Sequence, residues 1–126
     1  MSELYQLSIK EKLEGLKNSS FSSLELTESY LERIKRIDSE LNSYITVIEE
    51  EARVKAKESD QRYQAESPLP LDGIPIAHKD IFCTEGVLTT CGSKMLSNFI
   101  SPYSATVVKK YEENGSVVLG KTNMDE

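Results

Sequence analysis

The first half of the chain repeats apolar residues at the spacing of amphipathic helices. Ser8 and Glu11 form the Ser-x-x-Glu pattern of a capping box, and the apolar residues after them predict a short helix that ends within residues 15–18. A second capping box, from Ser22 to Glu25, predicts the start of a longer helix. One face of this longer helix is formed by Leu24, Leu31, Ile34 and Ile37.

Two further elements are predicted before residue 67. The longer helix is expected to end at the polar segment 38–42, and residues 44–48 (YITVI) have the composition of a strand. Residues 49–64 are mostly helix formers with few apolar positions, so this third helix is expected to be largely solvated. Residues 1–66 are therefore predicted to form a mainly helical region.

From residue 67 the pattern changes to alternating strands and helices. Prolines and a glycine surround the apolar run 74–77, which predicts a buried strand followed by a loop. Ser104 is placed to cap a helix over residues 105–113, and residues 117–119 (VVL) predict a second short buried strand. Strand, helix and strand in this order predict a parallel pair within an α/β sheet.

The predicted fold class is α/β, with the N-terminal helices packed on the first strands of a mixed sheet. Residues 67–126 are expected to be the start of the α/β core, and the sheet is expected to be incomplete because one parallel pair normally needs more strands. The last strand is predicted to be an unprotected edge. Such edges tend to pair with another chain, so dimerisation through this edge is an expectation.

Composition and charge exclude several classes of function. The chain has 126 residues, with 15 Lys and Arg against 21 Asp and Glu, and its net charge of −6 predicts little direct contact with nucleic acid. No apolar run is long enough to cross a bilayer, and the first residues have neither signal-peptide nor transit-peptide character, so a cytoplasmic location without membrane contact is expected. Cys83 and Cys91 lack the CxxC spacing of zinc or redox sites and are interpreted as free thiols.

Residues 115–122 (GSVVLGKT) fit the written pattern of a phosphate-binding loop, but their context contradicts that function. A working loop follows a strand, wraps its backbone amides around phosphates and leads into a helix. Here the segment follows a predicted helix, and the two Val and one Leu between its glycines are typical of a strand. We therefore reject nucleotide binding by this segment.

Lys79 is the first candidate for a catalytic side chain. It lies at the end of an apolar strand, in a segment whose backbone is restricted by prolines and a glycine. Removal of a lysine from water disfavours its charged form, and a neutral lysine acts as a general base. The alternative is a solvated lysine paired with Asp80 or Glu85, and the residues alone favour this alternative.

Three blocks of the second half resemble, in order, the opening blocks of the amidase-signature family. Residues 71–80 (LDGIPIAHKD) and the following segment 84–93 (TEGVLTTCGS) resemble the first block. Residues 101–108 (SPYSATVV) and 120–126 (GKTNMDE) resemble the next two, and residues 41–47 match more loosely. Several long blocks in one order are far more specific than one short pattern.

The resemblance implies amide hydrolysis by a serine nucleophile, a second serine in a cis peptide and a lysine. The family's lysine falls on Lys79, which would accept a proton through the bridging serine and later return it. Both serines belong to a Ser- and Gly-rich segment without a counterpart in these residues, so the chain alone is expected to be inactive. His78 is a rival base, but strand alternation points it away from Lys79, and we interpret it as a packed neutral side chain.

Within the family, residues 122–126 and the helical N-terminus are most similar to amidotransferase A subunits. This similarity implies release of ammonia from glutamine, which partner subunits B and C would use to convert Glu-tRNA(Gln) to Gln-tRNA(Gln). The chain is expected to bind no cofactor or metal, with ATP and Mg²⁺ bound by one of the partners. Two alternatives stay open: a free-standing amidase of small amides, and a non-catalytic interaction fragment that acts through its N-terminal helices.

Overall fold

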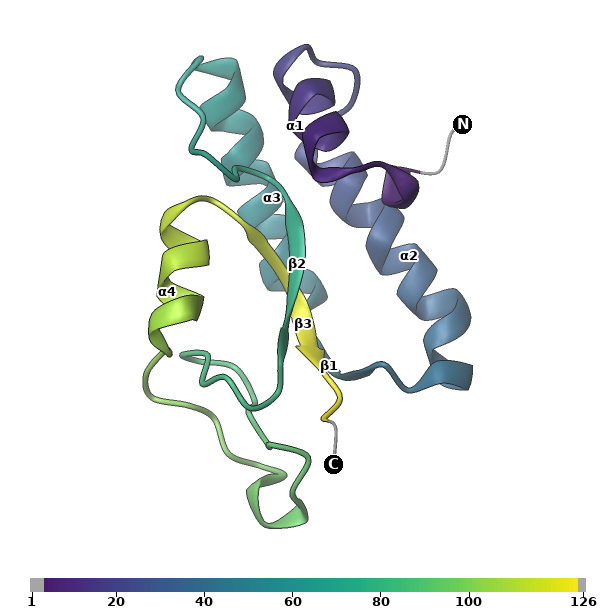
Figure 1. Cartoon of the computed structure of the whole chain (residues 1–126), viewed down its shortest axis with the longest axis vertical. Helices are drawn as coiled ribbons and strands as arrows, with labels where there is room; N and C mark the ends of the chain where they lie inside the picture. Colours follow the sequence, from purple (N-terminus) through teal and green to yellow (C-terminus); the bar gives the residue numbers. More distant parts are fainter. Residues whose placement is uncertain (1–3, 125–126) are drawn as a thin grey trace.

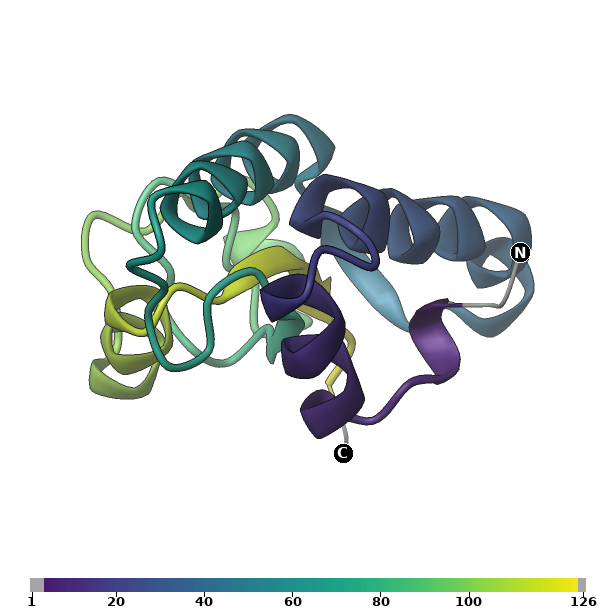
Figure 2. The ribbon, with the colours of Figure 1, turned by 90° about the horizontal axis from the view of Figure 1, so that it is seen from above.

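A three-stranded mixed sheet lies between helices (Figures 1 and 2). The computed structural model describes residues 4–124. The elements in chain order are η1 (Leu4–Gln6), α1 (Ile9–Lys17), α2 (Ser23–Leu41), β1 (Tyr44–Val47), α3 (Glu49–Gln64), β2 (Pro75–Lys79), η2 (Lys94–Leu96), α4 (Thr106–Glu113) and β3 (Val117–Thr122). In Figure 2, α2 and α3 lie together over one face of the sheet, and α4 lies toward the other. The predicted α/β class is therefore confirmed.

The local signals in the sequence correctly place the starts of the first two helices. Both capping boxes are formed, with Ser8 and Glu11 at α1 and with Ser22 and Glu25 at α2. Each box satisfies two backbone N–H groups that have no partner within the helix. No helix within residues 4–124 is long and apolar enough to span a bilayer.

Helix α2 continues through the polar segment that was predicted to end it. The helix ends only at Leu41, and Asn42 then adopts a left-handed conformation with φ 52°. The Asp38 carboxylate accepts hydrogen bonds from the backbone N–H groups of Ser43 (2.8 Å) and Tyr44 (3.3 Å). Asp38 thus organises the turn after the helix from inside its last turn, which explains why this polar residue does not break α2.

Helix α3 was predicted to be largely solvated, and most of its residues are exposed or only partly buried. Ala52, Ala56 and Ser59 are fully buried, and α3 packs against both α2 and β3. Small side chains one helical turn apart let neighbouring elements approach closely, but they add little to a hydrophobic pattern. A narrow stripe of small side chains therefore holds this mostly solvated helix on the core.

The buried apolar residues form two clusters. The first joins α2 and α3 to β3 and contains Leu31, Ala52, Ala56, Val117 and Leu119. The second joins α1 and α2 to the start of β2 and contains Leu4, Leu16, Leu26 and Ile74. Full burial of each large side chain stabilises the fold by about 1.5–3 kcal/mol, so both clusters anchor the sheet to the helices.

The order of the strands corrects the prediction that the last strand is an edge. The order is β1-β3-β2, and β3 runs parallel to β2 and antiparallel to β1. β3 is therefore central because β1, which comes from the helical first half, pairs with its other side. The prediction of a dimer through β3 loses its basis, since β1 and β2 are the outer strands.

Two further boundaries differ from the sequence prediction. β2 extends through His78 to Lys79, and β3 extends to Thr122, so both strands are longer than their apolar runs. Ser104 does not cap α4, whose N-cap is Ala105. The Ser104 hydroxyl instead accepts a hydrogen bond from the Glu85 backbone N–H (2.9 Å), because a loop close in space competes for it.

Candidate functional site

Lys79 is the last residue of β2 and lies opposite Thr122 in the parallel pair. The next residue, Asp80, donates its backbone N–H to the Thr122 carbonyl (3.0 Å), and the Lys79 carbonyl accepts the N–H of Phe82 (3.0 Å). The backbone of Lys79 is therefore fixed on both sides, and its side chain is partly buried. The carboxyl ends of parallel strands are the usual place for ligand sites in α/β sheets.

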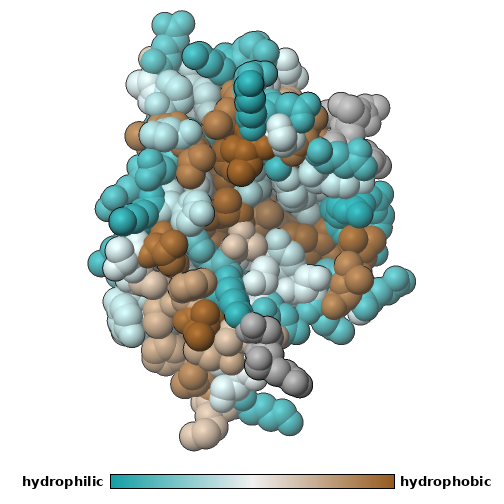
Figure 3. All heavy atoms as spheres, viewed as in Figure 1, coloured by the Kyte–Doolittle hydropathy of each residue, from teal (hydrophilic) through white to brown (hydrophobic). Residues whose placement is uncertain are grey.

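An open groove of about 480 Å³ runs along β2 beside Lys79. Its walls are formed by Ile76, Ala77, His78, Lys79, Phe82, Val107 and Tyr111. On the face shown in Figure 3, hydrophobic side chains gather along the middle of the molecule, where Figure 1 places β2. The groove thus combines apolar walls with the amine of Lys79, as binding sites for organic substrates commonly do.

A second lysine, Lys121 on β3, is completely buried next to Asp80, which is also completely buried. The two side chains form an ion pair with 3.8 Å between Lys121 Nζ and Asp80 Oδ1. Lys121 Nζ also donates hydrogen bonds to the Phe82 carbonyl and to Thr89 Oγ1 (3.2 Å). Burial lowers the pKa of Lys121, and the nearby Asp80 carboxylate opposes that shift.

The other carboxylate oxygen of Asp80 binds the far end of the following loop. Asp80 Oδ2 accepts hydrogen bonds from the backbone N–H (3.0 Å) and from the hydroxyl of Thr90. Asp80 was considered from the sequence as a partner for Lys79, whereas its buried ion pair is with Lys121. The site therefore contains two lysines at neighbouring strand ends, one bordering a groove and one enclosed.

His78 has the character of a packed neutral side chain. It is buried, its ring meets that of Tyr111 edge to face at 5.8 Å, and its Nε2 has no hydrogen-bond partner among the described residues. Burial lowers the pKa of His78, and the positive charge of Lys121 lowers it further. The register pairs His78 with Lys121 and Lys79 with Thr122, so alternation places the two β2 side chains on opposite faces.

The segment that fits the phosphate-loop pattern is a turn followed by β3. Gly115 has φ +88°, and residues 117–122 are strand, so the backbone does not form a phosphate cradle. Lys121 belongs both to this rejected pattern and to the family-like block 120–126, and neither pattern indicates that its side chain is buried. The available signal was a charged residue soon after an apolar strand. Only the fold shows that Asp80 lies next to Lys121.

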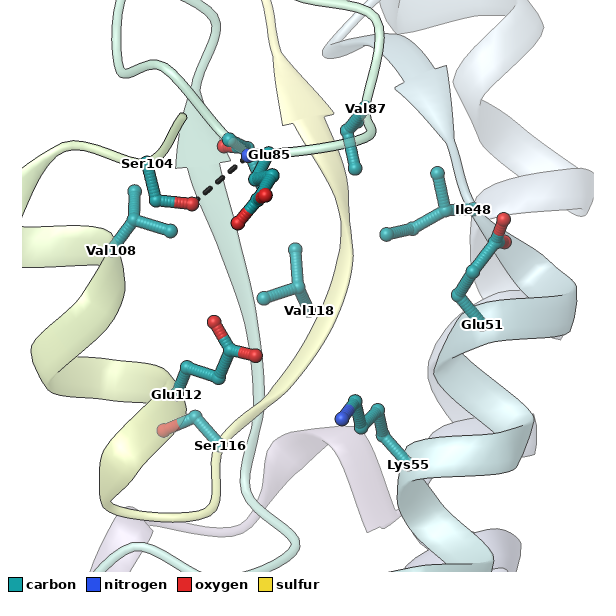
Figure 4. A pocket seen from close by; sticks show the side chains of 11 residues that line it. Ile48, Glu51, Lys55, Glu85, Val87, Ser104, Val108, Glu112, Ser116 and Val118 are labelled. Atoms are coloured by element: carbon teal, nitrogen blue, oxygen red, sulfur yellow. Dashed lines mark hydrogen bonds between the residues drawn. The ribbon is translucent and has the colours of Figure 1, made fainter. Parts of the chain in front are cut away.

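A second hollow of about 270 Å³ lies between α3, α4 and β3 (Figure 4). Lys55 from α3 and Glu112 from α4 point into it from opposite sides, and Glu51 and Glu85 also line it. Among residues 4–124, no group of three or more His, Cys, Asp or Glu side chains could hold a metal ion. Cys83 and Cys91 are free thiols, as expected.

Comparison with known proteins gives concordant similarities. A family model described as Amidase matches residues 25–126. The A subunit of glutamyl-tRNA(Gln) amidotransferase from Saccharophagus degradans is 56% identical over 123 residues, which are 98% of this chain and 25% of that protein. The A subunit of the same enzyme from Psychrobacter cryohalolentis is 56% identical over 126 residues, which are 100% of this chain and 25% of that protein.

The structure of the native peptide amidase from Stenotrophomonas maltophilia superposes with a TM-score of 0.88 at 30% identity. The superposition covers 94% of this chain and 25% of the peptide amidase. The chain thus spans about a quarter of the length of these relatives.

Proposed function

Because the chain belongs to the amidase family, we propose that it is the N-terminal part of the glutamine amidase subunit of a Glu-tRNA(Gln) amidotransferase. The observation that carries this proposal is the 56% identity to amidotransferase A subunits along the whole chain. The position of Lys79 at a strand end, beside an open groove, supports its role in the reaction.

In this proposal Lys79 is the general base of a Ser–cisSer–Lys mechanism. Neutral Lys79 takes a proton from the bridging serine, which takes one from the nucleophilic serine as that oxygen attacks the amide carbon of glutamine. The protons return through the same relay to the leaving ammonia, and water then releases glutamate from the acyl-enzyme.

By analogy with the family, both serines are proposed to belong to a segment that follows the block matched by residues 120–126. This chain alone is therefore proposed to be inactive, because the nucleophile and the oxyanion donors supply most of the lowering of the barrier. Partner subunits B and C would receive the ammonia and bind ATP and Mg²⁺ in the cytoplasm. The net charge of −6 is in keeping with a chain that leaves most tRNA contact to those partners.

The test is glutamine-dependent ammonia release by the full-length gene product together with its partner subunits. Lys79→Ala is expected to lower the rate about 10³-fold or more, as removal of a member of a catalytic unit does. Lys109→Ala, on the exposed side of α4, is the matched control and should keep the wild-type rate. Wild-type activity of Lys79→Ala would rule out the mechanism.

A second candidate is a free-standing amidase, which the superposition on peptide amidase favours. The same assay separates the two functions when it is run without partner subunits. Hydrolysis of simple amides that needs no partner would establish the free amidase. Activity that depends on the partners would establish the amidotransferase function.

A further inference from the structure

We infer that Asp80 and Lys121 are positioning residues for Lys79, because their buried pair fixes the loop that begins directly after Lys79. This inference rests on the proposed function, since it assigns a role relative to Lys79. Neither residue borders the groove beside β2, so neither is proposed to touch the substrate.

Asp80 joins the two ends of this loop, which comprises residues 80–92. Its carboxylate binds the backbone N–H and the hydroxyl of Thr90, and its carbonyl accepts the N–H of Cys91 (3.3 Å). The Thr90 hydroxyl in turn accepts the N–H of Gly92 (3.2 Å). The returning end of the loop is therefore attached to the residue that follows Lys79.

Lys121 holds the same loop from β3. Its ammonium group binds the Phe82 carbonyl on the outgoing side and the Thr89 hydroxyl on the returning side. Phe82 also donates its N–H to the Lys79 carbonyl and lines the groove next to Lys79. One buried cation thus links the loop, the groove wall and the backbone of Lys79.

A bulge in β3 gives Lys121 this position. Ile76 lies opposite Val118 and Ala77 opposite Gly120, so Leu119 is an extra residue in β3. Regular alternation would send Lys121 into the core that contains Val117 and Leu119, but the bulge places it beside His78 instead. Bulges that re-aim a side chain are common next to active sites.

Stability alone gives little reason to bury this pair. Replacement of a buried ion pair by apolar residues of similar size is often neutral or stabilising. The loop also holds Cys91 at φ 53°, a left-handed conformation that is unfavourable for a residue other than glycine. A buried pair that is costly and that maintains a strained loop beside Lys79 is better explained by a role in positioning Lys79.

The decisive variant is Asp80→Asn with Lys121→Met in the full-length protein with its partners, because it removes both charges together. We expect kcat for ammonia release to fall about 10²-fold, the effect of a misplacement of about 1 Å, while KM for glutamine changes less than about twofold. Amide hydrogen exchange in residues 82–92 should become faster. Lys109→Met, exposed on α4, is the matched control and should change neither kcat nor the rate of amide hydrogen exchange.

The outcomes separate this inference from the proposed function. A folded double variant with wild-type kcat, or one whose KM rises while kcat is unchanged, overturns the positioning role. If the double variant does not fold, Thr90→Val is measured instead, because it keeps both charges of the pair and removes only the hydroxyl that donates to Asp80. A lower kcat in Thr90→Val supports the role, and an unchanged kcat overturns it. Full activity of Lys79→Ala defeats the proposed function instead, and the inference that depends on it.

Discussion

Each end of β2 buries an aspartate, but the two carboxylates are bound in different ways. At the amino end, Asp72 accepts two hydrogen bonds of 2.6 Å from Arg62 of α3 and one of 3.0 Å from the Leu69 N–H. Arg62 remains 33% exposed, so its charge keeps contact with water. Nearby, Tyr63 donates its hydroxyl to the Asp72 carbonyl (2.8 Å), and burial raises the pKa of Tyr63 to about 12.

At the carboxyl end, both members of the pair are completely buried and the separation is longer, 3.8 Å. Asp80 Oδ1 has no hydrogen bond within the described part of the chain. The Asp72 carboxylate is thus fully paired where α3 meets the segment before β2, whereas Asp80 at the carboxyl end holds a loop through a longer and less satisfied pair. Buried groups that are fully hydrogen-bonded stabilise a fold, and a buried carboxylate oxygen without a hydrogen bond calls for an explanation.

The largest effect that would test this comparison is expected from Arg62→Met. The substitution leaves Asp72 buried without a cation, and breaking a buried pair in this way costs about 3 kcal/mol of the free energy of unfolding. Urea unfolding of wild type and variant measures this loss. Arg53→Met breaks the more exposed pair with Glu28 and should cost clearly less stability, because water screens an exposed pair. Equal losses would remove the distinction between buried and surface pairs.

A smaller effect is expected from Gly120→Ala, at the end of the sheet that holds Lys121. A Cβ atom at Gly120 would lie 2.1 Å from the Thr46 carbonyl oxygen, so β1 would have to move away from β3. Overpacking of this kind costs about 2 kcal/mol, which urea unfolding would detect.

The control for this substitution is Gly86→Ala. No atom lies within 4 Å of a Cβ at Gly86, and only its φ of +75° opposes a side chain, at a cost of about 1 kcal/mol. If Gly120→Ala costs no more than Gly86→Ala, the close approach of β1 to β3 does not limit the structure.

The smallest effect is expected in the pH dependence of stability. His78 is the only histidine, and its pKa is lowered in the folded state by burial and by Lys121. The unfolded chain therefore binds a proton more readily, so stability is full above about pH 6.5 and falls as the pH drops below that value. His78→Phe keeps an aromatic ring beside Tyr111 and should lose less stability between pH 7 and pH 5.5 in urea unfolding. An equal loss in both proteins would contradict this assignment.

Local interactions made parts of the fold predictable from the sequence. Both capping boxes act within four residues, so Ser8 and Ser22 marked the starts of α1 and α2. The parallel pair was predictable because strand, helix and strand follow each other directly. The division into residues 1–66 and 67–126 stays a prediction.

The features that were predicted wrongly from the sequence all depend on contacts with residues distant in the chain. Ser104 binds the backbone N–H of Glu85 instead of capping α4. The central place of β3 depends on β1, a strand about 70 residues earlier. None of these contacts has a signal in the local pattern of apolar residues.

The sequence by itself determined the starts of α1 and α2, the parallel pair and the family, because local hydrogen bonds and ordered motifs act at short range. The catalytic role of Lys79 stays a prediction. Only the tertiary structure decided which lysine is enclosed. The ion pair of Lys121 with Asp80 depends on a one-residue bulge and on a loop that returns to its own starting point. Strand register and loop closure are set by packing across the whole sheet, so no short segment encodes them.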